Sequence, residues 1–264
     1  MRIASLSPAA TEILFMLGIG ADIVCVDQFS NFPEEAKTLP RVRGHQKISA
    51  EALRTYAPEL ILTGTVIQQK LSEELKAAGF GVVHQDPRTI SAVYEAIRQL
   101  GAILERTAEA EDLILKMQQG FNAVKKKSAI FAAGTNARPR IYIEEWHRPP
   151  MASGNWVPEV IRIAGGEPFP IGPVGALHAT PLSREVTFQE VEKFDPDLIV
   201  ISWCGAGALA DKKILLERER WGNLRAIKEG HVRVIDDSLL NRPGPRLLEG
   251  AQRMYAWLFE RMCS

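Results

Sequence analysis

Two similar stretches decide the fold, ISAEALRTYAPELILTG at Ile48–Gly64 and VTFQEVEKFDPDLIVIS at Val186–Ser202. In each, a helical pattern passes through an aromatic residue, a proline and an acidic residue into a short apolar run. Continuous apolar runs of this length are typical of strands in a parallel sheet that is covered on both faces. We interpret the two stretches as copies of one supersecondary unit.

A second pair of segments repeats at the same spacing. Strand-like runs over Arg2–Leu6 and Arg140–Glu144 lie equally far ahead of the two stretches, and a helical pattern that stops at glycine follows each run. Each copy closes with a further helix and strand. Because strands alternate with helices in both copies, the chain is predicted to form two three-layer α/β lobes with mainly parallel sheets.

Between the copies, Ala108–Lys127 is rich in alanine and glutamate and places apolar residues at helical spacing. Such a run predicts one helix about 30 Å long, at about 1.5 Å per residue, and not a flexible linker. The predicted organisation is an N-terminal lobe over residues 1–106, a rigid linking helix over 107–128 and a C-terminal lobe over 129–264.

The composition excludes several function classes. Lysine plus arginine equals aspartate plus glutamate at 32 each, so no strong field would draw the chain to nucleic acid or to an acidic membrane surface. No apolar run approaches the roughly 18 residues of a membrane-spanning helix, and the first residues lack the pattern of a secretory signal. We expect no nucleic-acid partner, no membrane insertion and a cytoplasmic location, or a periplasmic or cell-surface one if a leader was removed.

Parallel α/β sheets bind ligands at the carboxyl ends of their strands, so the strand-end loops of both lobes are expected to face a shared cleft. In the second lobe this rule selects Trp146, Trp156, Trp203 and Asp237. The indoles could wall a pocket for a large flat ligand, because rigid aromatic faces bury well against one. The alternative is that they are ordinary core residues. Asp237 could accept a hydrogen bond from a ligand.

The chain offers no complete catalytic set. Glu144 and Glu145 are adjacent in a predicted strand, so their side chains point to opposite faces and cannot act as a carboxylate pair. Cys204 lies in a strand-end loop where a nucleophile could stand, and the alternative is a small buried thiol. With Cys25 and Cys263 it predicts neither a disulfide framework nor a zinc site. The protein is expected not to be an enzyme.

The order of several motifs resembles one family of binding proteins. The segments RIASLSPAATEILFMLGIG, FSNFPEEA, YAPELIL, ASGNWVPEVIRIAGGE and RPGPRLLEGAQ follow one another along almost the whole chain. This series is similar to that of the cobalamin-binding proteins that feed ABC importers, within the wider group of class III periplasmic binding proteins that also take up siderophores and haem. The resemblance implies a monomer without an intrinsic cofactor that binds a corrinoid between two lobes joined by one long helix.

The resemblance also implies binding residues in the first lobe. Phe29 and Phe32 match aromatic positions of the loop that contacts the corrinoid. His45 and Gly64 stand where the cobalamin binders carry tryptophans, which shifts the expected aromatic wall to the second lobe. A neutral imidazole suits cobalt or haem iron, so His45 and His147 are the candidate metal ligands. The alternative for His147 is a solvated turn.

Members of this family dock on a permease through one surface glutamate in each lobe. The position that aligns in the first lobe is Gln69, with Glu73 and Glu74 one turn later, and Glu217 and Glu219 are candidates in the second. An ABC importer permease is therefore a candidate partner. A cytoplasmic corrinoid-handling role without a permease is the alternative.

These observations predict a binding protein that captures a cobalamin-like corrinoid in an interlobe cleft by aromatic burial and a few hydrogen bonds. Two alternatives stay open. One is the same fold binding an iron siderophore or haem, and the other is an enzyme that modifies a corrinoid or metal complex through Cys204 or His147.

Overall fold

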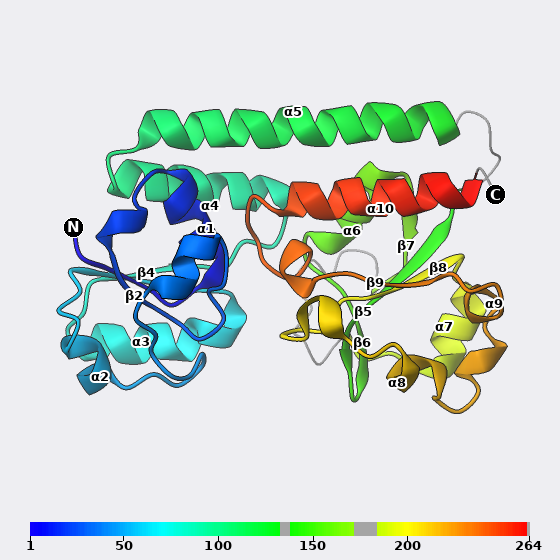
Figure 1. The fold of residues 1–264 in the computed structure, drawn as a ribbon, viewed down its shortest axis with the longest axis horizontal. Coiled ribbons are helices and arrows are strands. Elements are labelled where there is room, and N and C mark those ends of the chain that lie inside the picture. Colours follow the sequence, from blue (N-terminus) through cyan, green and yellow to red (C-terminus); the bar gives the residue numbers. More distant parts are fainter. Residues whose placement is uncertain (133–137, 172–183, 263–264) are drawn as a thin grey trace. The chain divides into compact units, whose positions relative to one another are not determined.

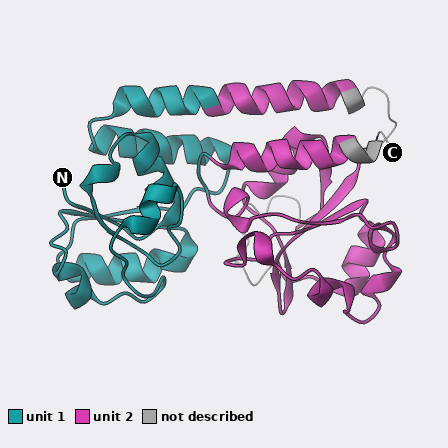
Figure 2. Ribbon diagram, in the orientation of Figure 1, with its two compact units in different colours: residues 1–116, 243–245 teal, residues 117–242, 246–264 magenta. Residues whose placement is uncertain are grey.

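The structure is a computed structural model that describes residues 1–132, 138–171 and 184–262. The chain divides into two compact units, Met1–Lys116 with Pro243–Pro245, and Met117–Arg242 with Arg246–Ser264 (Figure 2). Each unit has its own sheet, and the predicted class, α/β with mainly parallel sheets, is confirmed (Figure 1).

The first unit is built on a parallel sheet with the strand order β2-β1-β3-β4. Ser7 starts the first helix, because its side chain accepts a hydrogen bond from the backbone N of Ala10 while Pro8 takes the first helical position. In Figure 1, α1 and α4 cover one face of this sheet, and α2 and α3 cover the other. The elements are β1 (Ile3–Ser5), α1 (Pro8–Met16), η1 (Gly20–Asp22), β2 (Ile23–Val26), η2 (Glu34–Thr38), α2 (Ala50–Arg54), β3 (Leu60–Gly64), η3 (Val66–Gln68), α3 (Gln69–Ala77), β4 (Val82–Gln85) and α4 (Ile90–Ile103).

The second unit repeats the plan with additions. Its sheet has the order β6-β5-β8-β9, and β7 also pairs with β5. Thr187 and Glu190 form a capping box at the start of α7, which fixes the helix that precedes β8. The elements are β5 (Arg140–His147), β6 (Pro150–Ala152), α6 (Val157–Ala164), β7 (Glu167–Pro168), α7 (Phe188–Phe194), β8 (Leu198–Ile201), η5 (Gly207–Leu209), α8 (Lys213–Leu216), η6 (Trp221–Asn223), α9 (Arg225–Lys228), β9 (Val232–Val234), η7 (Asp237–Leu239) and α10 (Leu247–Met262).

The internal repeat predicted from the sequence is present in the strand order and register. β7, β5, β8 and β9 pair in the same parallel order as β2, β1, β3 and β4. Ile3 lies opposite Leu60 in the first unit, and Ile141 lies opposite Leu198 in the second. Both units therefore align their two central strands at equivalent residues.

The repeated acidic position has the same function in both copies. The backbone N of Arg2 donates to Oε2 of Glu59 at 2.8 Å, and the backbone N of Arg140 donates to Oδ2 of Asp197 at 2.7 Å. The acid before each buried strand thus satisfies a backbone N–H at the start of the neighbouring strand. This contact explains why the acid recurs.

The helix predicted over Ala108–Lys127 is present as α5 (Thr107–Ala132). The division between the two units falls inside it, after Lys116. Among the described residues, no helix combines the length and the apolar character that crossing a membrane requires.

The first strand of the second unit is longer than predicted. β5 continues to His147, whereas the sequence predicted its end at Glu144. Its last residues pair antiparallel with β6, so that Trp146 lies opposite Met151. The neighbouring strand β8 ends at Ile201, which pairs with Glu144 of β5. β5 continues beyond this pair because the hairpin with β6 supplies further backbone partners. Trp146 and His147 therefore stand on a strand and not in the predicted loop.

Candidate functional site

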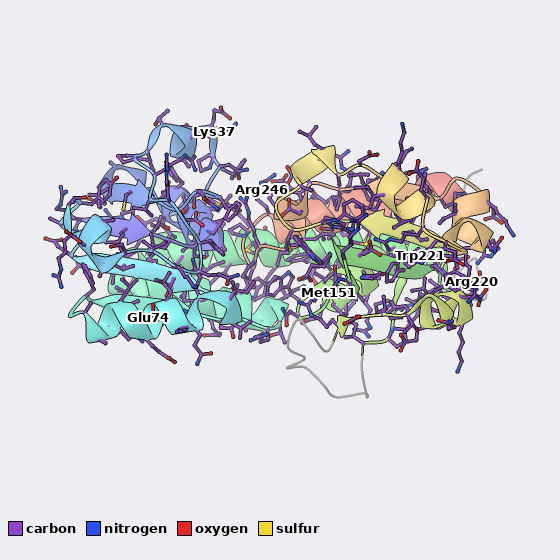
Figure 3. The ribbon with its side chains drawn as sticks, turned by 90° about the horizontal axis from the view of Figure 1, so that it is seen from below. Lys37, Glu74, Met151, Arg220, Trp221 and Arg246 are labelled. Carbon is purple, nitrogen blue, oxygen red and sulfur yellow. The ribbon has the colours of Figure 1, made fainter. Side chains whose placement is uncertain are left out.

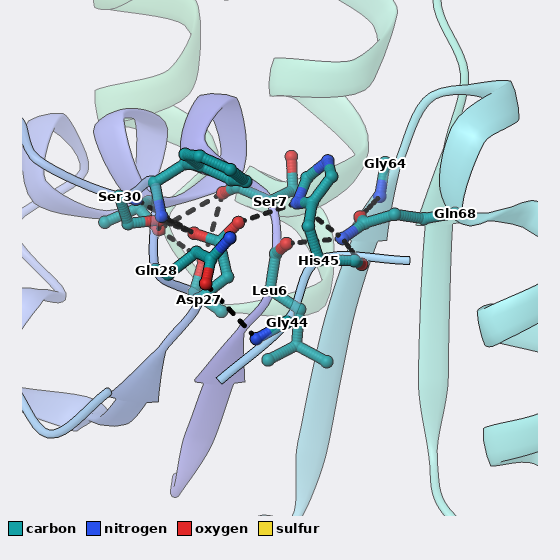
Figure 4. A network of polar contacts seen from close by, with 12 residues as sticks. Leu6, Ser7, Asp27, Gln28, Ser30, Gly44, His45, Gly64 and Gln68 are labelled. Carbon is teal, nitrogen blue, oxygen red and sulfur yellow. Dashed lines mark hydrogen bonds and ion pairs between the residues drawn. The ribbon is translucent and has the colours of Figure 1, made fainter. Parts of the chain in front are cut away.

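A buried carboxylate organises the strand ends of the first unit. Asp27 follows β2 and is fully buried. Its Oδ1 accepts hydrogen bonds from the backbone N of Phe29 (3.3 Å) and from the backbone N and Oγ of Ser30 (2.9 and 2.7 Å). Its Oδ2 lies 2.8 Å from Nδ1 of His45 (Figure 4). One carboxylate therefore fixes both the loop that carries Phe29 and the imidazole of His45.

Gln68 is a second buried side chain at this place. Its Oε1 accepts from the backbone N of Gly64 at 2.8 Å, and its Nε2 donates to the carbonyls of Leu6 (2.7 Å) and His45 (2.8 Å). These bonds join the ends of β1 and β3 to the loop that carries His45 (Figure 4). Sequence reasoning missed Asp27 and Gln68, although a polar residue directly after a buried apolar strand was a usable signal for Asp27.

The predicted contact residues of the first unit differ in exposure. Phe29 is 39% exposed, and its ring meets the ring of His45 edge to face at a centroid distance of 5.3 Å. Phe32 is half-buried three residues further on. Phe29 and His45 are therefore the predicted residues that the structure brings together in this unit.

Gly64 has a packing reason to be glycine. A Cβ at this position would lie 2.7 Å from Oγ and 3.2 Å from Cβ of Ser7, the residue that caps α1. A larger side chain fits only if the Ser7 side chain or the start of α1 shifts. The position therefore contributes its backbone, and the missing tryptophan has a structural explanation.

Gly64→Ala is expected to lower the free energy of unfolding by about 1–3 kcal/mol through overpacking. This loss outweighs the gain of about 0.4–1 kcal/mol from the reduced freedom of the unfolded chain. Urea denaturation followed by circular dichroism measures it. Gly222→Ala is the control, because a Cβ there would meet nothing within 4 Å. Equal midpoints for the two variants would contradict the packing argument.

Three aromatic rings gather at the end of β5 in the second unit. Trp146 and His147 have ring centroids 5.3 Å apart, and those of His147 and Trp203 are 4.7 Å apart. Trp146 is 39% exposed and donates from Nε1 to the carbonyl of Arg148 at 3.0 Å. Trp203 is almost fully buried. This ring stack, Trp146-His147-Trp203, presents one exposed indole on a buried aromatic base.

The two glutamates of β5 are both engaged, in agreement with the prediction that they form no carboxylate pair. Glu144 is fully buried and binds Arg218 through two hydrogen bonds of 2.6 and 2.7 Å. It also accepts from Trp203 Nε1 at 2.9 Å and from the hydroxyl of Tyr142 at 3.0 Å. Burial and the adjacent carboxylate raise the pKa of Tyr142 well above its usual value, so this hydroxyl stays protonated and donates.

Glu145 forms an ion pair with Arg184 through both carboxylate oxygens. Arg184 is almost fully buried and also donates to the carbonyl of Ala152 at 3.2 Å. Both acids of β5 are therefore engaged in ion pairs within the second unit, and Trp146 is the exposed ring at this strand end.

Trp156 occupies the core of the second unit. It is 4% exposed, and its Nε1 donates to the carbonyl of Leu240 at 2.6 Å. His147 has its Nδ1 buried without a bond from any described residue. Among the described residues, no group of three or more His, Cys, Asp or Glu side chains is placed to hold a metal ion.

Asp237 shapes a glycine loop after β8. Its Oδ2 accepts from the backbone N of Gly205 at 3.0 Å, and its Oδ1 accepts from that of Gly207 at 2.8 Å. Cys204 lies in the same loop, and its Sγ accepts from Asn241 Nδ2 at 3.2 Å. Packing around the sulfur, together with the carboxylates of Glu145 and Asp237, raises the pKa of this thiol even though the residue is exposed. A raised pKa disfavours the thiolate that a nucleophile needs; Cys263 lies outside the described residues.

A family model described as periplasmic binding protein matches residues 3–239. The chain belongs to the periplasmic binding protein family. The resemblance inferred from the sequence motifs is confirmed, and this periplasmic binding protein is a substrate-binding protein by family.

Two curated relatives cover most of this periplasmic binding protein. A vitamin B12-binding protein of Vibrio parahaemolyticus is 27% identical over 251 residues, which span 94% of this chain and 85% of that protein. An uncharacterized ABC transporter substrate-binding lipoprotein of Bacillus subtilis is 26% identical over 263 residues, which span 96% of this chain and 78% of that protein.

The fold is also that of solved structures. A periplasmic heme-binding protein from Pseudomonas aeruginosa superposes with a TM-score of 0.84 at 22% identity, over 98% of this chain and 92% of that one. That likeness concerns the fold. The sequence was expected to belong to a cytoplasmic protein. The names of these relatives and solved structures do not support that location.

The predicted docking residues of this periplasmic binding protein lie on short helices and turns. In α3, Gln69 donates from Nε2 to Glu73 Oε1 at 3.3 Å, and Glu74 lies 3.8 Å from the Nζ of Lys70. Figure 3 shows Glu74 at the surface of the first unit. In the second unit, Glu217 and Glu219 follow α8. Docking through these residues stays a prediction.

Proposed function

We propose that this protein is the substrate-binding component of an ABC importer for a corrinoid of the cobalamin type. The observation that carries the proposal is the similarity, along 94% of the chain, to a protein named for binding vitamin B12. The ABC transporter named in the Bacillus subtilis relative supports a permease as partner. The word lipoprotein in that relative's name supports a location outside the cytoplasm. In this proposal the protein is a monomer and docks through its surface glutamates.

Two sets of aromatic side chains support a large flat ligand. In the first unit, Phe29 and His45 lie on two loops that Asp27 joins, and their rings are in edge-to-face contact. In the second unit, the ring stack offers the exposed face of Trp146. A corrin ring has broad faces that bury well against rigid aromatic side chains at a low cost in conformational entropy.

The other predicted contacts have different tasks in this proposal. Phe32 is half-buried beside Phe29 in sequence and widens the apolar surface of that loop. Gly64 is buried and holds Gln68 through its backbone N, and Trp156 is part of the core of the second unit. Asp237 orients the Gly205–Gly207 loop, in which Gly205 is exposed.

Cyanocobalamin is expected to bind the purified chain with a Kd at or below about 1 µM, which corresponds to about −8 kcal/mol. Isothermal titration calorimetry measures the affinity, with haemin and an iron siderophore titrated in parallel as the competing ligand classes. Cobalamin recovered unchanged after incubation would count against the enzyme that the sequence left open. Binding of haemin or the siderophore, with no heat from cobalamin up to roughly 1 mM, would overturn the proposal.

A further inference from the structure

We infer that His45 ligates the metal of the bound corrinoid through Nε2, and that Asp27 and Gln68 are positioning residues that hold the imidazole in the tautomer required for this bond. The inference rests on the proposed function and adds a coordination bond to it. Cobalamin is the cargo, so the metal arrives with the ligand.

The hydrogen bonds around His45 decide which ring nitrogen carries the proton. Gln68 Nε2 lies 3.2 Å from His45 Nδ1, but its two hydrogens already point to the carbonyls of Leu6 and His45. Its orientation is set by Oε1, which accepts from the N–H of Gly64. In the neutral imidazole, Nδ1 must therefore donate to the carboxylate of Asp27, and Nε2 keeps its lone pair.

The position of His45 leaves that lone pair accessible. The side chain is 24% exposed, and Figure 4 shows its second nitrogen on the side away from Asp27. Gly44 makes the preceding turn at φ +100°, where a Cβ would collide with the carbonyl oxygen of Lys47. Phe29 covers one side of the ring at a centroid distance of 5.3 Å. The imidazole is thus held in one orientation before any ligand arrives.

This arrangement is the carboxylate–histidine pair that orients metal-ligating imidazoles and raises their basicity. One imidazole supplies too few ligands for a bare metal ion. One imidazole is enough for a cobalt whose four equatorial positions are already filled by a corrin, because such a cobalt needs a single axial ligand from the protein. His147 has no comparable orienting partner, since its Nδ1 is buried and receives no bond from the described residues.

The proposed step is a ligand exchange at Co(III). In aquocobalamin the bond between cobalt and the upper water breaks, the water leaves with its electron pair, and the lone pair of Nε2 forms the new Co–N bond. The exchange uses the neutral form of the imidazole, so no proton moves, and the cobalt keeps its oxidation state. Cyanide holds the same position firmly, so cyanocobalamin is expected to bind without this exchange.

Visible absorption spectra of the full chain with aquocobalamin test the inference. We expect the cobalamin bands to shift toward those of imidazole-ligated cobalamin, and His45→Ala to abolish the shift. Asp27→Asn keeps an oxygen for Ser30 but turns an amide N–H toward Nδ1, which forces the proton onto Nε2. This variant is expected to lose the shift and to bind aquocobalamin about 10- to 100-fold more weakly.

His84→Ala is the matched control, because His84 lies in the same unit and its Nδ1 is occupied by Thr63 at 2.9 Å. Calorimetry with cyanocobalamin separates the two proposals and reports folding of each variant. Binding of both cobalamins without a spectral shift, or a shift that survives in His45→Ala, would overturn the ligation and leave the proposed function in place. Binding of neither cobalamin would overturn both.

Discussion

Arg218→Ala is expected to lower the free energy of unfolding by about 3–5 kcal/mol, because it leaves the Glu144 carboxylate buried without its counter-charge. The Arg218 guanidinium donates two hydrogen bonds, of 2.6 and 2.7 Å, to the Glu144 carboxylate and balances its charge. Arg218 also stacks over the ring of Trp221 at 4.7 Å and donates to the carbonyl of His147 at 3.1 Å. Guanidinium denaturation monitored by tryptophan fluorescence measures the loss.

Two further variants separate the buried charge from lost contacts. Glu144→Gln added to Arg218→Ala is expected to recover part of the stability, because it removes the buried charge. The amide oxygen of glutamine accepts from Trp203 Nε1, and its amide N–H donates to the hydroxyl oxygen of Tyr142. Lys116→Ala removes an exposed ion pair with Asp112 and is expected to cost about 0–1 kcal/mol. A double variant no more stable than Arg218→Ala would exclude the buried charge as the cause.

Trp146→Ala is expected to weaken cobalamin binding about 30-fold, or about 2 kcal/mol, the size of effect that anchoring tryptophans have at interfaces. The exposed indole is already held by its bond to the carbonyl of Arg148 and by its packing against His147. Little entropy is therefore lost when a ligand covers it. Isothermal titration calorimetry with cyanocobalamin gives the ratio of the two dissociation constants.

Phe259→Ala is the matched control for Trp146→Ala. Phe259 lies on α10 of the same unit and is 40% exposed, against 39% for Trp146. The substitution removes a similar exposed aromatic surface away from the strand ends. The affinity for cyanocobalamin is therefore expected to stay within a factor of two. An equal loss in both variants would show that the effect of Trp146 is not local.

Local pattern was enough to predict the repeated elements and the long helix. The repeated acid before β3 and β8 and the helical spacing of α5 are each encoded within a few residues, and each is present. The end of β5 was predicted too early, because β6 supplies its partners and a strand's length depends on what pairs with it.

The candidate site was predicted only in part. Phe29 and His45 were named, and the structure brings them together. Asp27, which holds both, was missed because a buried carboxylate is recognised only from the donors around it. The three tryptophans had equal standing in the sequence, but Trp146 is exposed while Trp156 and Trp203 are buried. The shared cleft between the lobes stays a prediction of the sequence.

The sequence by itself determined the duplicated α/β units, the long helix that follows the first of them, and the family. Those features rest on hydrophobic periodicity and turn chemistry, which act over neighbouring residues. The tertiary structure decided which polar groups meet: Asp27 with His45, and Glu144 with Arg218. Such pairs join residues far apart in the chain. Their geometry depends on sheet register and on burial, and neither can be read from local sequence. Burial also makes each hydrogen bond and each charge count for more in the free energy of folding.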